Sequence, residues 1–445
     1  FAYDHWVDLL MENGIKGSNI HELNKKVCVY NENARVKLPR FYVLNIPNLA
    51  MSHSINALDP EFLPTKMHIR QSIISLYQNL VPEFIKKKDF FDRNAINYII
   101  AVYYYYYKHA PEYCTLPHLV STCLLNFRAV LEKLRHDEEI RDMISQIIEP
   151  FEMGAADQQA GVIASVTDPL NQIYTKEIFW ATSGRDCTLD LNNPEDPKIL
   201  SICNDEAISS ALNPVIGLYA NIIFKMMNRS WEVDGQQQRP SFFHADEIPT
   251  IYIDGIDRVL ATSREYKVCT TLGLQLYSQF EQLYQKEMTR SIIGCCSNRF
   301  VGRVNDNETA EVNSKIFGEI EKEQYSKTRS ASGESLSESL KKERKIKTED
   351  LAFQEAGHFT GFTSDVPNPI FSAMFNVVKH KKPKEKQNQL TPFNRFGLDE
   401  GEELSANNWK AYTSQRLEEH FSGIRRDVRE FFEEELEMLN SQVAS

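Results

Sequence analysis

Apolar residues recur at helical spacing through a long stretch of the chain, residues 65–178, which contains few strand patterns. Residues three and four apart share one face of a helix, so this spacing predicts helices that each bury one side. Thr115 is a candidate N-cap, with Pro117 in the first turn after it. We therefore predict an all-α segment, and its clearest helices cover residues 69–80, 94–107, 116–134 and 138–148.

The stretches on either side alternate between short apolar runs and amphipathic helices. Before the all-α segment, a helix is predicted over Tyr3–Glu12 and strands over residues 27–30 and 41–44. After it, strands separated by helices of about 10–15 residues indicate βαβ units and therefore an α/β fold with a mainly parallel sheet. These strands are predicted over residues 199–203, 241–245, 268–274 and 299–303, and the helices over residues 213–228, 255–266, 276–288 and 309–317.

Three segments near the end differ from this pattern. Residues 321–348 are rich in Ser, Glu, Lys and Arg and almost lack apolar side chains, which predicts a flexible loop. Strand character returns at residues 357–362 and 371–378. A Glu- and Arg-rich helix is predicted over residues 407–439, with the acidic run Glu433–Glu435 near its end.

Composition and charge indicate a globular protein and limit how it could bind nucleic acid. Hydrophobic residues make up 42% and charged residues 25% of the 445, as in an ordinary globular protein. Lys+Arg 50 against Asp+Glu 62 gives a net charge of −12, so any contact with DNA or RNA needs a local basic lining.

Cysteine spacing and hydropathy argue against a zinc-binding protein, a disulfide-bonded protein and a membrane-spanning protein. The 8 cysteines form no C-x-x-C pair and no zinc-type cluster, which indicates reduced thiols in a cytosolic compartment and no metal held by side chains alone. The longest apolar run, Tyr98–Tyr107, ends in five tyrosines and is shorter than the roughly 20 residues of a membrane span. We expect no membrane span and no signal peptide.

Two consecutive carboxylates, Asp246 and Glu247, follow directly after the predicted strand over residues 241–245. Ligands bind at the carboxyl ends of strands in a parallel sheet. In P-loop nucleotide hydrolases the first such acid holds Mg²⁺, usually through water, and the second polarises the attacking water. Two solvated acids that simply end a strand would show the same sequence, so the pair alone leaves both interpretations open.

The residues around the acids resemble one family. Ile248–Thr250 follows them, then a helix that ends in Arg264, a strand, and a glutamine-containing turn. This order is similar to the catalytic half of the type IV secretion coupling ATPases, the TraD/TraG-type conjugative DNA-transfer proteins. Gln275 and Gln279 stand at the two glutamines of that family's Q-S-x-x-Q turn, with Leu276 in place of its serine.

Further segments extend the resemblance to roughly residues 40–380, and it is closest to members from Bacteroidetes. Ala57 replaces a common proline of the family, and His358 replaces an acid in a late strand. The matching segments, in chain order, are Ser52–Pro60, Thr115–Pro117, Arg299–Arg303, Asn307–Ala310 and Ala356–Phe359.

The resemblance implies a RecA-like P-loop NTPase core with an inserted all-α domain. Residues 1–64 would form the N-terminal part of the nucleotide-binding domain and residues 65–178 the inserted domain. Residues 179–380 would form the rest of the RecA-like domain, including the flexible loop. Residues 381–445 would form a C-terminal linker and the acidic helix.

The resemblance also assigns roles, with ATP and Mg²⁺ as cofactors. Glu247, Arg264 and Gln275 would be catalytic, and Asp246 and Arg303 would bind the nucleotide, with Asp246 holding Mg²⁺ through water. Arg264 would face the nucleotide of the neighbouring subunit, and Gln275 would contact the γ-phosphate. Local alternatives stay open: Arg264 can stabilise a helix C-terminus as a cation, and Gln275 can cap a helix.

One departure from the family affects the whole interpretation. The family needs G-x-x-x-x-G-K-[ST], whose backbone N–H groups and lysine hold the phosphates, and this chain contains no such segment. Gly14–Gly17 lacks both the spacing and the lysine. We expect the P-loop and a membrane anchor to lie upstream of Phe1. If the protein has instead lost the P-loop, the two acids are remnants.

The implied function is that of a coupling ATPase, a membrane-anchored homohexamer at the cytoplasmic face of the bacterial inner membrane. It would bring DNA or a relaxase–DNA complex to the channel proteins of a type IV secretion system. The alternative is a non-hydrolysing structural or docking component with a degenerate nucleotide site. A DNA-packaging or filament translocase is a third hypothesis, against which the inserted all-α domain argues.

Two further runs have competing interpretations. The five tyrosines Tyr103–Tyr107 can stack on nucleic-acid bases, but on a helix they point in all directions, which favours a core role. The basic run Lys379–Lys386 can contact DNA phosphates or anionic lipid, although a solvated linker is the simpler interpretation.

Overall fold

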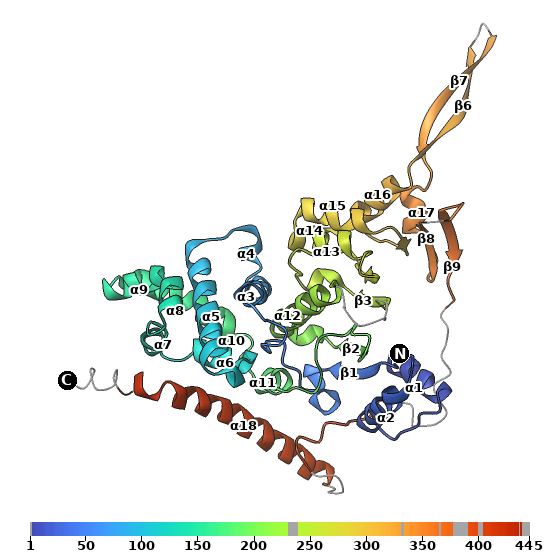
Figure 1. Cartoon of the computed structure of the whole chain (residues 1–445). Helices are drawn as coiled ribbons and strands as arrows, with labels where there is room; N and C mark the ends of the chain where they lie inside the picture. Colours follow the sequence, from blue (N-terminus) through green and yellow to red (C-terminus); the bar gives the residue numbers. More distant parts are fainter. Residues whose placement is uncertain are drawn as a thin grey trace. The chain divides into compact units, whose positions relative to one another are not determined.

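The computed structural model describes residues 2–229, 239–330, 333–364, 366–376, 390–398 and 404–435, and residue 437. The basic run at residues 379–386 lies outside them. The chain divides into two compact units, drawn in Figure 1. The larger unit comprises Phe1–Phe243, Thr250–Thr270 and Pro383–Ser445, and the smaller unit comprises His244–Pro249 and Thr271–Lys382.

The larger unit is mostly helical. Its α-helices are α1 (Ala2–Glu12), α2 (Ile20–Asn33), α3 (Lys66–Leu80), α4 (Glu83–Lys86), α5 (Phe90–His109), α6 (Leu116–Cys123), α7 (Phe127–Leu134), α8 (Glu138–Met143), α9 (Ser145–Glu152), α10 (Ala156–Asn171), α11 (Lys176–Ser183), α12 (Ser209–Met227), α13 (Ile256–Thr262) and α18 (Ala406–Phe431). Short 3-10 helices are η1 (Ile46–Met51), η2 (Pro111–Tyr113) and η3 (Glu206–Ile208), and its strands include β1 (Arg40–Leu44) and β2 (Lys198–Ile202).

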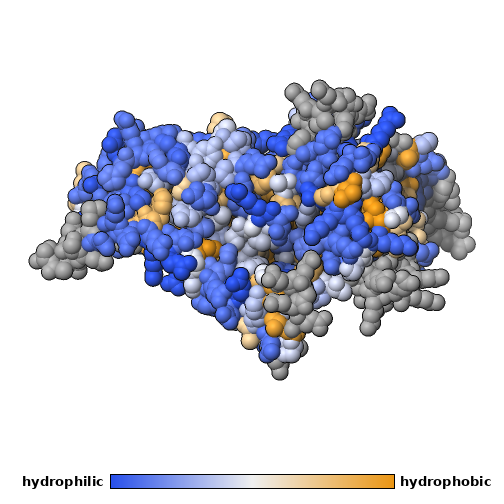
Figure 2. All heavy atoms as spheres, turned by 60° about the horizontal axis from the view of Figure 1, so that its bottom comes forward, coloured by the Kyte–Doolittle hydropathy of each residue, from blue (hydrophilic) through white to orange (hydrophobic). Residues whose placement is uncertain are grey.

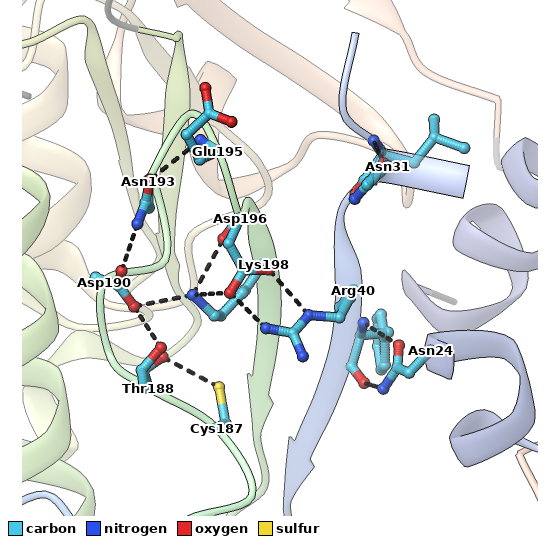
Figure 3. Close-up of polar contacts among 12 residues, drawn as sticks. Asn24, Asn31, Arg40, Cys187, Thr188, Asp190, Asn193, Glu195, Asp196 and Lys198 are labelled. Atoms are coloured by element: carbon cyan, nitrogen blue, oxygen red, sulfur yellow. Dashed lines mark hydrogen bonds and ion pairs between the residues drawn. The ribbon is translucent and has the colours of Figure 1, made fainter. Parts of the chain in front are cut away.

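Strands β1 and β2 pair in parallel, with Arg40 opposite Lys198 and Leu44 opposite Ile202. A network of ion pairs joins their first residues (Figure 3). The guanidinium of Arg40 pairs with the carboxylate of Asp196, and Nζ of Lys198 lies 2.8 Å from Oδ2 of Asp196 and 2.9 Å from Oδ1 of Asp190. The Lys198 side chain is only 1% exposed, so these carboxylates balance a buried charge.

The predicted strand over residues 27–30 is wrong, because these residues lie inside α2. The Asn19 side chain accepts a hydrogen bond from the Glu22 N–H and so caps this helix. Ile20, Leu23 and Val27 are buried at helical spacing. The short β-favouring run was therefore outweighed by an apolar period that extends over the whole helix.

Asparagine side chains of α2 complete the other edge of β1. Asn24 accepts a hydrogen bond from the N–H of Phe41 at 2.9 Å and donates one to its carbonyl at 2.8 Å (Figure 3). Asn31 likewise accepts a hydrogen bond from the N–H of Leu38, two residues before β1, and donates one to its carbonyl. The helix thus replaces a neighbouring strand and satisfies backbone groups that burial would otherwise leave unpaired.

The predicted helical segment is present as α3 to α11, and it shares one hydrophobic core with β1 and α12. Tyr103 and Tyr106 are fully buried and hydrogen-bond to the Leu58 carbonyl and the Thr122 hydroxyl. The core role of these two tyrosines is therefore confirmed. The proposed boundaries at residues 64 and 178 stay predictions.

One stretch, Glu206–Met227, is long and apolar enough to cross a membrane by length and composition. No span was expected from the sequence. In the larger unit 61% of its most apolar window is buried, and Gly217 lets α12 approach Asn79 of α3 closely. A helix in a protein core has the same composition, so this stretch is weak evidence for a membrane contact.

Helix α18 lies along the helical part of the larger unit (Figure 1). Its spacing predicts an apolar stripe of Phe421, Ile424, Val428 and Phe431, of which the first three are buried and Phe431 is half-buried. Glu435, in the acidic run after the helix, is only 5% exposed and lies 3.3 Å from Nζ of Lys133. The run is therefore not uniformly solvated.

The smaller unit contains α14 (Tyr277–Tyr284), α15 (Lys286–Cys295), α16 (Asn307–Ile316), α17 (Thr348–Ala352) and the strands β5 (Arg299–Val301), β6 (Glu319–Ser330), β7 (Gly333–Arg344), β8 (His358–Phe362) and β9 (Ile370–Met374). Strands β5, β8 and β9 form one antiparallel sheet. The mainly parallel sheet predicted from the sequence therefore does not include these strands. The short connection between β8 and β9 explains part of this, because parallel neighbours need a long crossover.

At residues 321–348, where a loop is predicted, the structure forms an antiparallel hairpin of β6 and β7 (Figure 1). The predicted flexibility of this segment stays a prediction. Its register runs from Glu319 opposite Arg344 to Ser330 opposite Gly333. Backbone hydrogen bonds of a ladder need no apolar core, so a polar sequence can form such a hairpin. Its stability without a third strand is nevertheless marginal.

Gly361 of β8 is expected to tolerate no side chain. An ideal Cβ at this residue would lie 2.0 Å from the carbonyl oxygen of Arg299 and 2.8 Å from the Phe371 ring. We expect Gly361→Ala to lower the free energy of unfolding by about 2 kcal/mol or more, since the strands must separate to fit it.

Chemical denaturation followed by fluorescence measures this effect. Gly294→Ala on α15 is the matched control, because a Cβ there meets no atom within 4 Å. That change should leave stability equal or slightly raised. Equal midpoints for the two variants would contradict the close contact at Gly361.

Candidate nucleotide site

The acids lie where two parallel strands end. β3 (Ser241–Ala245) and β4 (Val268–Leu272) are hydrogen-bonded neighbours. At one end the Ser241 N–H donates to the Lys267 carbonyl at 3.0 Å, and at the other the Gly273 N–H donates to the Ala245 carbonyl at 2.8 Å. Both strands therefore run in the same direction, and their carboxyl ends lie together.

Glu247 has an unusual backbone conformation, with φ 57°. Only a few per cent of residues other than glycine adopt positive φ, and such strain tends to occur at functional sites. The turn is fixed on both sides, because Ala245 accepts from Gly273 and the Ile248 N–H donates to the Gly273 carbonyl at 2.9 Å. The structure thus holds Glu247 in a set direction after the strand.

Asp246 is exposed and lies against Gly273 at the end of β4. A Cβ on Gly273 would come within 3.0 Å of the Asp246 Oδ1 atom. Gly273 therefore gives the carboxylate room beside the neighbouring strand. Sequence reasoning assigned no role to Gly273, although a glycine at a strand end just before Gln275 was the available signal.

Gln275 is exposed and lies two residues beyond Gly273. The N-cap of α14 is Leu276, which makes no side-chain cap bond, so Gln275 does not cap this helix. The start of α14 is anchored by the Tyr277 N–H, which donates to Oγ1 of the buried Thr309 at 3.2 Å. Chain continuity from Gly273 thus places Gln275 at the same strand ends as the acids.

Arg303 lies elsewhere, in the loop after β5 of the antiparallel sheet. This loop is held by the Val304 N–H, which donates to the Leu351 carbonyl, and by Gln354, which donates to the Gly302 carbonyl. Arg303 is exposed. In the part of the chain that the structure describes, it makes no hydrogen bond or ion pair with the acids.

Arg264 belongs to the larger unit, after α13. This helix ends at Thr262, so the predicted helix over residues 255–266 is too long and Arg264 lies in the turn beyond it. Its carbonyl accepts from the Lys267 N–H at 3.2 Å, while its side chain is exposed. An exposed cation beyond the last turn gains little from the helix dipole.

The donor atoms gathered at the strand ends suit a magnesium nucleotide. Carboxylate oxygens are the ligands that Mg²⁺ prefers, and it usually keeps several waters and takes one or two carboxylates. The described residues contain no group of three or more His, Cys, Asp or Glu able to hold a metal ion. Asp246 therefore fits a water-mediated contact to Mg²⁺ better than a site made of side chains alone.

Comparison with known proteins identifies relatives of this segment. Residues 240–354 match the family described as the TraM recognition site of TraD and TraG. The coupling protein TraD of Escherichia coli (strain K12) is 26% identical over 132 residues, which are 28% of this chain and 18% of TraD. The matched part is thus less than a fifth of the length of TraD. All five candidate site residues lie within residues 240–354.

Solved structures share the fold. The conjugative coupling protein TrwB lacking its first 70 residues, in its unbound form, is 15% identical with a TM-score of 0.54, covering 76% of this chain and 78% of its own. TrwB in complex with ADP and Mg²⁺ is 14% identical with a TM-score of 0.54, covering 81% and 83%. The predicted fold class, a RecA-like α/β core with an all-α insertion, is confirmed, as is the similarity to coupling proteins.

Proposed function

We propose that this chain, a relative of the type IV secretion coupling proteins, forms the motor core of an ATPase for conjugative DNA transfer. Its cargo would be DNA or a relaxase–DNA complex, passed to the secretion channel proteins. It would act as a homo-oligomer, a hexamer by the family pattern. Its place would be the cytoplasmic face of the bacterial inner membrane, anchored by a segment outside this sequence.

One observation carries the proposal: Asp246 and Glu247 lie at the carboxyl end of β3, beside the carboxyl end of β4, in a turn held by Gly273. Two solvated acids that merely end a strand need neither the positive φ of Glu247 nor the space beside Gly273. A nucleotide site uses both, because it requires two carboxylates in fixed and different directions.

The roles follow from chemistry and position. Asp246 would hold Mg²⁺ through water, and bound Mg²⁺ would neutralise charge on the phosphates. Glu247 would take the proton of the attacking water. Gln275, at the same strand ends, would contact the γ-phosphate, while Arg303 would contact the nucleotide from the antiparallel sheet. This sequence supplies the acidic half of such a site and contains no P-loop.

The test is calorimetry of ATP binding to the full-length gene product, with and without Mg²⁺. Asp246→Ala should remove most of the Mg²⁺-dependent gain in affinity, because the water-mediated contact to the metal is lost. Asp257→Ala on α13 is the matched control and should bind as the unaltered protein does. Folding of both variants is checked by thermal unfolding.

Two results of this calorimetry would contradict the proposal. An unaltered full-length protein that binds no nucleotide would overturn the motor function and favour a docking component with a degenerate site. Nucleotide binding that Asp246→Ala leaves unchanged would remove Asp246 from the metal site.

A further inference from the structure

The antiparallel sheet of the smaller unit has two unlike faces. One packs through Val301 and Phe362 onto a small core that includes Leu351 of α17. The other carries Phe300, Phe359, Phe371 and Phe375, which we call the aromatic face. Phe300 is 54% and Phe375 45% exposed. Hydrophobic residues are few on the side of the molecule seen in Figure 2, where most of the surface is hydrophilic.

Glycines make the aromatic face uneven. Gly361 lies opposite Phe300 on one side and Phe371 on the other, and Gly302 is next to the Phe359 ring. The rings pack on one another, with centroids 5.3 Å apart for Phe300 and Phe371. Phe359 and Phe375 meet edge to face at 83°.

Charge argues against nucleic acid as the ligand of this face. Binding of single strands combines stacking with a positively charged groove along the backbone. The three strands carry a single arginine or lysine, Arg299, and it lies over the Phe362 ring on the opposite face, 5.6 Å from the centroid. The aromatic face itself is therefore uncharged.

Strand β9 is an edge of this sheet, and no residue that the structure describes pairs with its outer backbone. The Thr363 N–H donates to the Pro369 carbonyl, and the Phe375 N–H donates to the Gly357 carbonyl. The odd-numbered residues of β9 therefore direct their N–H and C=O groups to β8. In an antiparallel ladder the alternate residues point away. Ile370, Ser372 and Met374 therefore present their backbone groups outward, and all three are exposed.

The side chains of β9 do nothing to prevent pairing. Natural edge strands usually carry charges, prolines or bulges that block edge-to-edge association. Residues 370–375, Ile-Phe-Ser-Ala-Met-Phe, contain no charge and no proline. An edge that the described part of the chain leaves uncovered is expected to be covered in the working protein.

We propose that β9 pairs antiparallel with β9 of a second copy of this chain, with Ser372 on the two-fold axis. This register places Ile370 opposite the partner's Met374, and Ser372 opposite the partner's Ser372. Every outward N–H and C=O group of Ile370, Ser372 and Met374 then forms a hydrogen bond. The register opposes the large Phe371 to the small Ala373 of the partner subunit. It brings no like charges together, and it joins the two aromatic faces into one surface.

The contact is separate from the proposed ATPase. A two-fold contact uses the same patch on both copies, whereas a ring is built from head-to-tail contacts between different patches. The β9 contact therefore joins copies in addition to any ring. Loss of pairing would leave nucleotide binding intact, and loss of nucleotide binding would leave pairing intact.

Disulfide trapping tests the register directly. Opposed residues of a hydrogen-bonded pair have Cα atoms about 5.5 Å apart, inside the roughly 4.4–6.8 Å range that a disulfide spans. In a background with the exposed Cys28 and Cys269 changed to serine, Ser372→Cys should give a covalent dimer as the main species under mild oxidation. The background protein without the added cysteine shows the contribution of the remaining thiols.

Met374→Cys is the matched control. In the proposed register Met374 lies opposite the partner's Ile370, so two copies of Met374→Cys hold their new thiols roughly 14 Å apart. Alone it should not cross-link, but mixed with Ile370→Cys it should. Equal cross-linking of Ser372→Cys and Met374→Cys would show random collision and overturn the register.

Charged residues at position 372 test whether the strand that pairs with β9 belongs to a second copy of this chain. Ser372→Lys and Ser372→Asp each place like charges across the axis and should weaken dimerisation up to about fivefold, measured by light scattering. A mixture of the two should restore it, since opposite charges then face each other. An unaltered chain that stays monomeric, or a dimer that neither variant weakens, would overturn the proposal, and a different occupant of β9 would then be required.

Discussion

Glu247→Gln is expected to bind ATP and Mg²⁺ normally and to hydrolyse ATP at least about 100-fold more slowly than the unaltered full-length protein. Glutamine keeps the size and hydrogen bonding of glutamate but takes up no proton, and loss of a general base costs a factor of about this size. The fixed turn between Ala245 and Ile248 holds either side chain in the same direction. Steady-state phosphate release measures the rate, and calorimetry measures binding.

Two further variants test whether the loss of hydrolysis is specific to the carboxylate of Glu247. Glu287→Gln on α15, a highly exposed acid 3.5 Å from Arg290, should leave the rate unchanged. Glu247→Asp retains the carboxylate but shortens its reach, so it should retain more activity than Glu247→Gln. Normal turnover by Glu247→Gln would assign the acid to the strand end alone, and loss of ATP binding would show a positioning role.

Arg264→Ala is expected to reduce hydrolysis about 1000-fold with nucleotide affinity nearly intact. An arginine supplied by a neighbouring subunit stabilises charge that develops in the transition state, and its loss costs at least this much. The side chain is exposed beyond the end of α13, where a second subunit can contact it. Arg290→Ala, which removes another exposed arginine, should leave the rate unchanged.

Mixed oligomers test whether Arg264 acts on a neighbour. A subunit with Arg264→Ala still offers an intact Glu247, and a subunit with Glu247→Gln still offers an intact Arg264. Mixing the two inactive proteins should therefore restore part of the activity at shared interfaces. Full activity of Arg264→Ala alone, or no recovery in mixtures, would leave this arginine with only a local role.

The helices and the order of elements followed from local patterns. Helices α3 to α11 form because apolar side chains three and four apart must share a buried face, and this requirement is met within each helix. The strand before Asp246 and Glu247 and the later strand before Gln275 were found as short apolar runs that alternate with the helices. The chemistry of the acids was therefore visible in the sequence, and the family resemblance named their roles.

Strand partners and exact element ends were decided by packing. Residues 27–30 favour a strand locally, but Ile20 and Val27 bury one face of a longer helix whose Asn24 completes β1. The polar segment over residues 321–348 lacks a core, yet it pairs with itself through backbone bonds that no apolar pattern reports. Helix α13 stops at Thr262, which leaves Arg264 in a turn.

The sequence by itself determined most of the helices, and that two acids and a glutamine follow strands, because these depend on neighbours along the chain. Only the tertiary structure decided which strand ends meet, since that depends on contacts between residues far apart in sequence. Gly273 beside Asp246 and the positive φ of Glu247 are such consequences. The uncharged edge of β9 is another, because an edge exists only once the other strands of its sheet are placed.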